Sequence, residues 1–172
     1  MNRSARTDTL TLAVTGTAWM GRGVGSVQSV IEELLSRANS EIQIAIYEMT
    51  AGAEDFLDRL ATCLARGIRV MMIVNRYDDK PAFIREKLKS LAGKFPQFEI
   101  LKFQPEIESE DLHAKILVVD RQDALVGSAN LTWKGLVGNH ELAVAISGPT
   151  ASKIAELVDK LSLDGRVMRV RE

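Results

Sequence analysis

The residues whose types suit chemistry are concentrated in one stretch of the chain, residues 111–141. His113 and Lys115 stand two positions apart at the start of the apolar run 116–119, so a strand would place both side chains on one face. An imidazole can attack an electrophile or transfer a proton, and an adjacent ammonium stabilises negative charge. The pair therefore suits an anionic substrate. Further candidates in the stretch are Asp120, Ser128, Asn130 and Glu141.

The spacing of these residues resembles the signature of the phospholipase D superfamily. His113, Lys115 and Asp120 form its H-x-K-x-x-x-x-D pattern, and Gly-Ser-x-Asn at 127–130 and then Glu141 follow. Residues 40–70 are also similar to the strand, helix and strand that precede the motif in that family, so the likeness covers about residues 26–162. The motif is specific for the superfamily but not for the substrate.

The resemblance implies cleavage of a phosphodiester without a metal ion. His113 would attack phosphorus as a neutral imidazole and form a phospho-histidine that water later resolves, while the His of a second motif copy acts as the general acid. Glu141 would accept the second N–H of the imidazole and so fix its tautomer. Considered alone, His113 would be interpreted as an ordinary histidine at a strand end, and Glu141 as one member of a surface pair.

The remaining candidates have both a chemical and a structural interpretation. The resemblance implies that Lys115 and Asn130 bind the non-bridging phosphate oxygens and that Ser128 contributes its hydroxyl. Gly-Ser-Ala-Asn also suits a plain turn, so Ser128 and Asn130 are equally well explained as turn formers. Asp120 is expected to be a structural hydrogen-bond or ion-pair partner. No cluster of His, Cys and carboxylates has metal-ligand spacing, so neither a metal nor another cofactor is expected.

The signature occurs only once, because no Lys follows His140 at the required position. The resemblance then implies a homodimer in which two chains place their motifs face to face across a two-fold axis and form one composite site. Such a chain looks like the small dimeric endonucleases of the family, so nucleic acid, and DNA rather than RNA, is the leading substrate. An uncontrolled nuclease would be harmful, so a regulatory protein partner is also expected. The alternatives are a non-catalytic dimerisation or nucleic-acid-binding module of a defence or repair complex, and a phosphodiesterase acting on lipid or a small molecule.

Substrate contacts are expected from loops beside the motif. The net charge of −1 gives the whole molecule no strong field for nucleic acid, so any anion site must be local. Trp133 would either stack on a base or pack at the dimer seam. The glycine-rich loop 16–25 lacks the ending of a P-loop and the spacing of a dinucleotide fingerprint, which favours an active-site edge or a plain connection. The basic residues in predicted loops are Arg22, Arg76, Lys80 and Lys134.

Length and composition predict one globular domain. The chain has 172 residues, of which 46% are hydrophobic and 26% charged. The core should span about residues 9–162; the ends, 1–8 and 164–172, are either loose or, for the second, a short edge strand. Cys63 falls on an apolar helix position and is interpreted as a small buried hydrophobe. Residues 1–20 make a poor secretory signal and no stretch suits a transmembrane helix, so a soluble cytoplasmic protein without membrane contact is expected.

Strand and helix patterns alternate along the chain. Strands are predicted at 9–15, 41–48, 68–74, 97–103, 116–119 and 142–146, and helices at 27–38, 53–66, 81–93 and after 148. Ser26 is the expected N-cap of the first helix, and Gly67 is expected to end the second. This order predicts an α/β domain, layered α/β/α, with a mixed and largely parallel central sheet to which the turn at 120–123 adds an antiparallel pair. The phospholipase D-like topology itself rests on the resemblance.

Overall fold

Alternating apolar side chains at residues 41–48 form a strand, β3 (Glu41–Ile46), whose two faces are both buried. The computed structural model describes residues 7–19, 21, 23–107 and 109–170, and within them β3 is one of nine strands in a single sheet. The other strands are β1 (Thr9–Thr15), β2 (Gly25–Ser26), β4 (Arg69–Asn75), β5 (Phe98–Phe103), β6 (Lys115–Val119), β7 (Asp123–Gly127), β8 (Glu141–Ser147) and β9 (Val167–Arg169).

The sheet is mixed, as predicted, but parallel pairing does not dominate it. The strand order is β2-β1-β8-β7-β6-β3-β4-β5-β9. In the described part of the chain, three neighbouring pairs are parallel (β1–β2, β3–β4 and β4–β5) and five are antiparallel. The prediction of a largely parallel sheet is therefore wrong. Helix crossovers join β3, β4 and β5, whereas connections without a crossover join β6, β7 and β8, and these give antiparallel neighbours.

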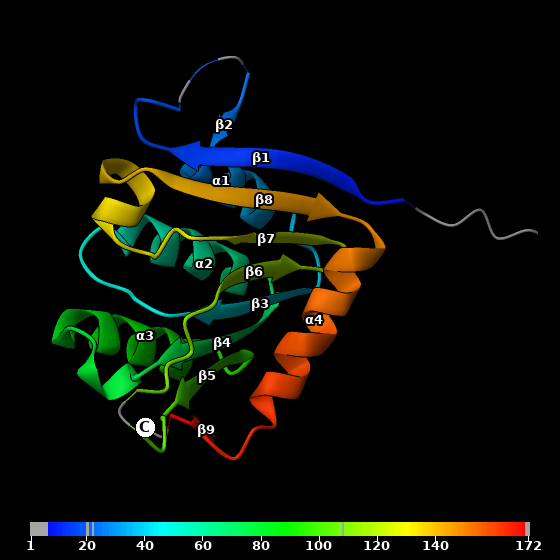
Figure 1. Ribbon diagram of the computed structural model, residues 1–172. Helices are drawn as coiled ribbons and strands as arrows, with labels where there is room; N and C mark the ends of the chain where they lie inside the picture. The colour runs from blue at the N-terminus through cyan, green and yellow to red at the C-terminus, as the bar shows by residue number, and fades with distance from the viewer. Residues whose placement is uncertain (1–6, 20, 22, 108, 171–172) are drawn as a thin grey trace, which may run out of the picture.

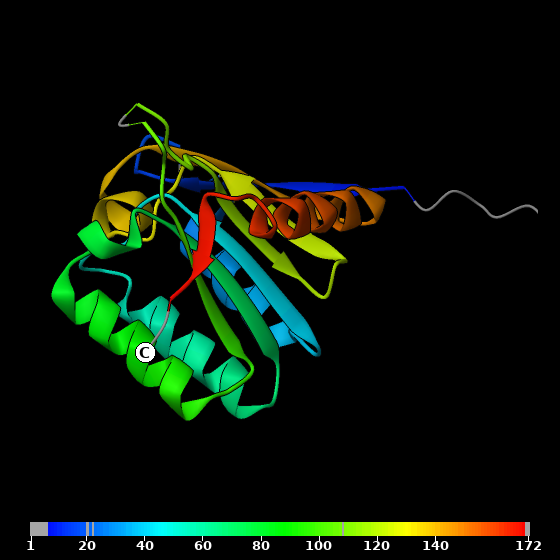
Figure 2. The ribbon, with the colours of Figure 1, turned by 90° about the horizontal axis from the view of Figure 1, so that it is seen from below.

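Helices cover both faces of the sheet, which confirms the α/β/α layering. On one face lie α1 (Val27–Arg37), α2 (Glu54–Ala65) and α3 (Ala82–Lys94), and on the other lies α4 (Pro149–Ser162) (Figures 1 and 2). The main core packs between the sheet and the first three helices, around Ile44, Leu60 and Ile84. A smaller cluster that includes Ala124 and Ala155 lies under α4. None of the helices in the described residues combines the length and hydropathy needed to cross a membrane.

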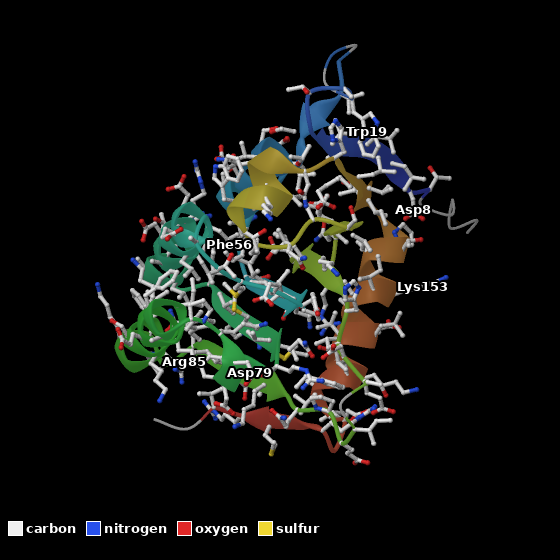
Figure 3. The ribbon with its side chains drawn as sticks, turned by 60° about the vertical axis from the view of Figure 1, so that its left-hand side comes forward. Asp8, Trp19, Phe56, Asp79, Arg85 and Lys153 are labelled. Atoms are coloured by element: carbon white, nitrogen blue, oxygen red, sulfur yellow. The ribbon has the colours of Figure 1, made fainter. Side chains whose placement is uncertain are left out.

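Local signals set the ends of the helices. The Ser26 hydroxyl accepts a hydrogen bond from the Ser29 amide at 2.9 Å and caps α1, as predicted. Gly67 adopts a φ of +84° after α2, in the left-handed region that suits glycine. The N-terminus of α4 is capped by Asp8, which accepts from the Thr150 amide at 2.9 Å (Figure 3). Hydrogen bonds from the hydroxyl and amide of Thr150 lower the pKa of Asp8.

Three features differ from the sequence prediction or complete it. Phe83 and Leu157 stand at helical spacing with the buried apolar residues of α3 and α4, which predicts that they lie in the core, but both are exposed. Small residues such as Ala151 face the sheet from α4 instead. The polar loop 75–80 contains a short 3-10 helix, η1 (Tyr77–Asp79), in which Tyr77 is buried. The end of the chain forms β9, which pairs with β5, so it is an edge strand.

Candidate active site

Four of the predicted site residues, His113, Lys115, Ser128 and Glu141, lie at one edge of the sheet, on the left in Figure 1, where β3 and β7 end and β6 and β8 begin. His113 lies two residues before β6, Ser128 directly follows β7, and Glu141 is the first residue of β8. The antiparallel order of β6, β7 and β8 brings them together, because the end of one strand lies beside the start of the next.

The Lys115 ammonium and the His113 imidazole are in direct contact. Lys115 Nζ lies 3.0 Å from His113 Nδ1 and 3.3 Å from Nε2, and it donates to the His113 carbonyl oxygen at 2.8 Å. His113 is exposed, whereas Lys115 is only 9% exposed. Burial lowers the pKa of the Lys115 ammonium, and the charge of Glu141 partly offsets this effect. An accessible imidazole beside a buried positive charge is suited to attack on an anion.

Glu141 is held by hydrogen bonds from two side chains, one just before β8 and one just after β7. The Ser128 hydroxyl donates to one carboxylate oxygen, and the Asn139 side-chain amide donates to the other at 3.1 Å. Ser128 Oγ also accepts from the Leu142 amide at 3.2 Å. Asn139 was missed in the sequence analysis. A hydrogen bond between His113 and Glu141 is not among the contacts of the described residues, so the orienting role of Glu141 stays a prediction.

Asn130 lies between β7 and a short π-helix, η2 (Lys134–Gly138). The backbone around it is fixed against the loop after β3, because the Leu131 amide donates to the Glu48 carbonyl at 3.1 Å and the Trp133 amide to the Ala51 carbonyl at 2.8 Å. Among the described residues, the buried Oδ1 of Asn130 has no hydrogen-bond partner. Burial of an acceptor without a partner costs free energy, which the fold accepts at this position.

Asp120 follows the last residue of β6, at the opposite end of that strand from His113. Its carboxylate accepts hydrogen bonds from the amides of Asn39, Ser40 and Glu41 at 2.8–3.0 Å and from the Ser40 hydroxyl at 2.7 Å. Burial alone would raise the pKa of Asp120, but these hydrogen bonds lower it further than burial raises it. Asp120 therefore fastens the turn after β6 to the start of β3, which is a structural role.

The aromatic residues of two loops lie at the border of the site. Trp133 is exposed just before η2, and Lys134 is exposed at its first position. Trp19, labelled in Figure 3, packs against the His140 ring with centroids 5.6 Å apart, which holds Trp19 beside the start of β8. Arg22, predicted in the same loop, lies outside the described residues.

The two other basic loop residues are paired with carboxylates. Arg76 Nε lies 2.6 Å from the Asp111 carboxylate. Hydrogen bonds from Arg76 and Asn75 lower the pKa of Asp111. Lys80 was expected to reach solvent from a loop beside the motif, and this prediction is wrong. The side chain is 5% exposed, and its ammonium lies 3.0 Å from the Glu48 carboxylate. Within the described residues, no group of three or more His, Cys, Asp or Glu side chains is arranged to hold a metal ion.

Tyr47 is a site residue that the sequence analysis missed. It directly follows β3, and its ring centroid lies 4.3 Å from that of His113. Strands β3 and β6 pair so that Ile46 is opposite Lys115, which brings Tyr47, the residue after β3, beside the motif. The alternation at 41–48 is visible in the sequence, but this register is not.

Comparisons with known proteins agree with this arrangement. A family profile described as the PLD-like domain of cardiolipin synthase matches residues 31–161. The DISARM protein DrmC of Bacillus paralicheniformis is 25% identical over 122 residues, which are 70% of this chain and 49% of that protein. Cardiolipin synthase A of Buchnera aphidicola is 32% identical over 101 residues, 55% of this chain and 19% of that protein. The chain therefore spans about half the length of the first relative and about a fifth of the second.

A solved structure shares the fold across almost the whole chain. The crystal structure of Nuc from Salmonella typhimurium, a phospholipase D family member, superposes with a TM-score of 0.76 over 96% of this chain and 100% of that chain, at 17% identity. The family profile covers the sheet from β3 to β8 together with the His113–Lys115 pair and Glu141. The chain therefore belongs to the phospholipase D superfamily and contains a PLD-like domain.

Proposed function

We propose that this protein is a metal-independent phosphodiesterase that hydrolyses nucleic acid at the composite site of a homodimer. The observation that carries the proposal is the contact of 3.0 Å between Lys115 Nζ and Nδ1 of the exposed His113 imidazole. The pair supplies a nucleophile and a fixed positive charge, which are the two functions that attack on a phosphodiester anion requires.

The proposed reaction has two steps. A ring nitrogen of neutral His113 donates its lone pair to phosphorus, and the bond from phosphorus to the leaving oxygen breaks with its electrons. The Lys115 ammonium and the Asn130 amide stabilise charge on the non-bridging oxygens, and a general acid gives a proton to the leaving oxygen. Water then attacks the phospho-histidine, passes its proton to the group that lost one, and frees the His113 imidazole.

The general acid must come from outside the His113–Lys115 pair. The chain has two histidines, and the ring contact of the second, His140, is with Trp19. We therefore assign the acid to the His113 of a second copy, which a two-fold axis beside the site would bring opposite the first.

An exposed apolar face beside the site fits this second copy. Strands β1 and β8 pair so that Leu10 is opposite Ile146 and Leu12 is opposite Val144, and alternation puts Leu142 on the same face. Leu10, Leu12 and Leu142 are exposed. Helix α4 covers the other end of this side of the sheet (Figure 1). Contiguous exposed apolar side chains of this kind mark interaction sites. The β1–β8 apolar face is the name used below for Leu10, Leu12, Leu142, Val144 and Ile146.

Nucleic acid is proposed as the substrate because the chain carries one motif and exposes Trp133 and Lys134, which suit a base and a phosphate respectively. A regulatory protein partner is proposed as well, because an uncontrolled nuclease would be harmful. A phospholipid is the second candidate, because the family profile and one relative are described as cardiolipin synthase.

Cleavage in excess EDTA tests the proposal. Labelled single- and double-stranded DNA and RNA, and a vesicle containing labelled cardiolipin, are incubated with the wild-type protein and with His113→Ala. We expect nucleic acid to be cut despite chelation, the variant to be inactive, and an alkali-stable phosphoryl label to be trapped on the wild-type chain. A folded wild-type dimer that cuts no nucleic acid would refute the proposed nuclease activity. Cleavage that is abolished by EDTA would refute the proposal that the reaction needs no metal ion.

A further inference from the structure

The ring of Tyr47 contacts both members of the His113–Lys115 pair. Its centroid lies 4.3 Å from the centroid of the His113 imidazole, and the two planes are inclined by 52°. Lys115 Nζ lies 4.9 Å from the same centroid. The half-buried ring is therefore a common wall for the imidazole and the ammonium at the end of β3.

A second ammonium approaches the same ring. Lys80 Nζ lies 5.7 Å from the Tyr47 centroid and 3.0 Å from the Glu48 carboxylate. The face of an aromatic ring carries partial negative charge and attracts cations within about 6 Å. Glu48 compensates the charge of Lys80, so the buried Lys115 is the ammonium for which the ring face matters more.

The other tyrosine, Tyr77, shows how a tyrosine of the core is packed in this chain, and its contacts differ from those of Tyr47. Tyr77 is 1% exposed, and its hydroxyl donates to the Arg85 carbonyl at 3.2 Å. The ring contacts of Tyr47 are instead with His113 and the two lysines. Packing of the core therefore does not account for an aromatic residue at position 47.

We infer that Tyr47 is a positioning residue, whose ring holds the His113 imidazole and the Lys115 ammonium in the relative geometry that attack on phosphorus requires. The inference rests on the proposed phosphodiesterase function. A nucleophile displaced by about 1 Å can lose about 100-fold in rate, and contacts between aromatic rings are directional enough to prevent such a displacement. The role belongs to the ring and not to the hydroxyl.

Three variants separate the ring from the hydroxyl and from bulk. Tyr47→Phe keeps the ring, whereas Tyr47→Leu and Tyr47→Met keep apolar volume without it. We expect Tyr47→Phe to retain kcat within about three-fold, and both other variants to lose about 10- to 100-fold in kcat with little change in KM. Thermal unfolding is measured for all three, and the Met variant decides the result if the Leu variant does not fold.

A second readout needs no activity. The chain has two histidines, so proton NMR of the ring protons, with His140→Gln to identify the second signal, follows His113 directly. The aromatic ring should displace the His113 signals in the wild type and in Tyr47→Phe, and the Leu and Met variants should move them towards free histidine. If the protein cuts no phosphodiester, the NMR result still decides the contact, so this failure is distinguishable from failure of the proposed function.

Two outcomes would overturn the inference. In the first, Tyr47→Leu and Tyr47→Met keep both the His113 signals and the wild-type kcat, which would make the ring dispensable. In the second, Tyr47→Phe loses as much kcat as Tyr47→Leu, which would assign the function to the hydroxyl.

Discussion

Lys115 Nζ lies 3.0 Å from His113 Nδ1, although Lys115 is 9% exposed and His113 is open to solvent. The start of β6 explains this difference, because Lys115 is already a strand residue, opposite Ile46 of β3, whereas His113 precedes the strand. The hydrogen bonds of the ammonium are to the ring and carbonyl of His113 and not to a carboxylate. In the proposed reaction, this charge therefore acts on the anion that His113 attacks.

Lys115→Met removes the positive charge and should affect activity without reducing the stability of the fold. We expect the rate of phosphodiester cleavage to fall about 100- to 1000-fold, because the fixed charge that stabilises the transition state is lost. The thermal midpoint should stay the same or rise, because burying an ammonium costs free energy that a thioether avoids. Lys115→Arg, which keeps the charge, is the control. A methionine variant with wild-type activity would contradict the role of the ammonium.

Leu12 is 52% exposed on the β1–β8 apolar face and is expected to be buried in the proposed dimer. Leu12→Glu places a charge there and should shift the protein to monomers in sedimentation equilibrium, with loss of cleavage because the composite site is incomplete. Leu163→Glu is the matched control, since that leucine is 85% exposed beyond the end of α4. A Leu12→Glu protein that remains an active dimer would show that the second copy docks elsewhere.

Asp120→Asn should destabilise the fold without altering the site chemistry. The hydrogen bonds from residues 39–41 lower the pKa of Asp120, so the carboxylate stabilises the native state above the unfolded-state pKa of about 4, and this contribution is lost as the pH falls through the lower folded-state pKa. We expect a loss of about 1–3 kcal/mol in urea unfolding at pH 7. The difference between variant and wild type should shrink below about pH 4. An equal difference at both pH values would contradict this account.

Gly127→Ala tests the close approach of β7 and β8. A Cβ at residue 127 would lie 2.6 Å from the Leu142 carbonyl oxygen and would also meet Ala143, so the end of β7 must shift and move Ser128 away from Glu141. We expect a loss of about 1–3 kcal/mol in stability, together with lower activity. Gly165→Ala, where a Cβ meets no atom within 4 Å, should be neutral in both assays. Equal thermal midpoints for the two variants would contradict the crowding at residue 127.

Local patterns predicted the elements of this fold well. The strand at Thr9–Thr15 and the cap at Ser26 are found as predicted, because alternation and capping depend on neighbours a few residues away. The burial of Cys63 also follows from helical periodicity. Phe83 failed as a core residue because helical spacing shows which side chains share a stripe but not how far the stripe is covered.

The sequence by itself determined the superfamily and placed His113, Lys115 and Glu141 at the starts of predicted strands, because apolar runs depend on residues that adjoin in the chain. Contacts across the sheet were decided by the tertiary structure alone. The balance of antiparallel and parallel pairs, the burial of Lys80 and the contact of Tyr47 with His113 all depend on strand register and packing between distant segments. Local sequence carries the period of each strand, but it does not carry the free energy of one register relative to another.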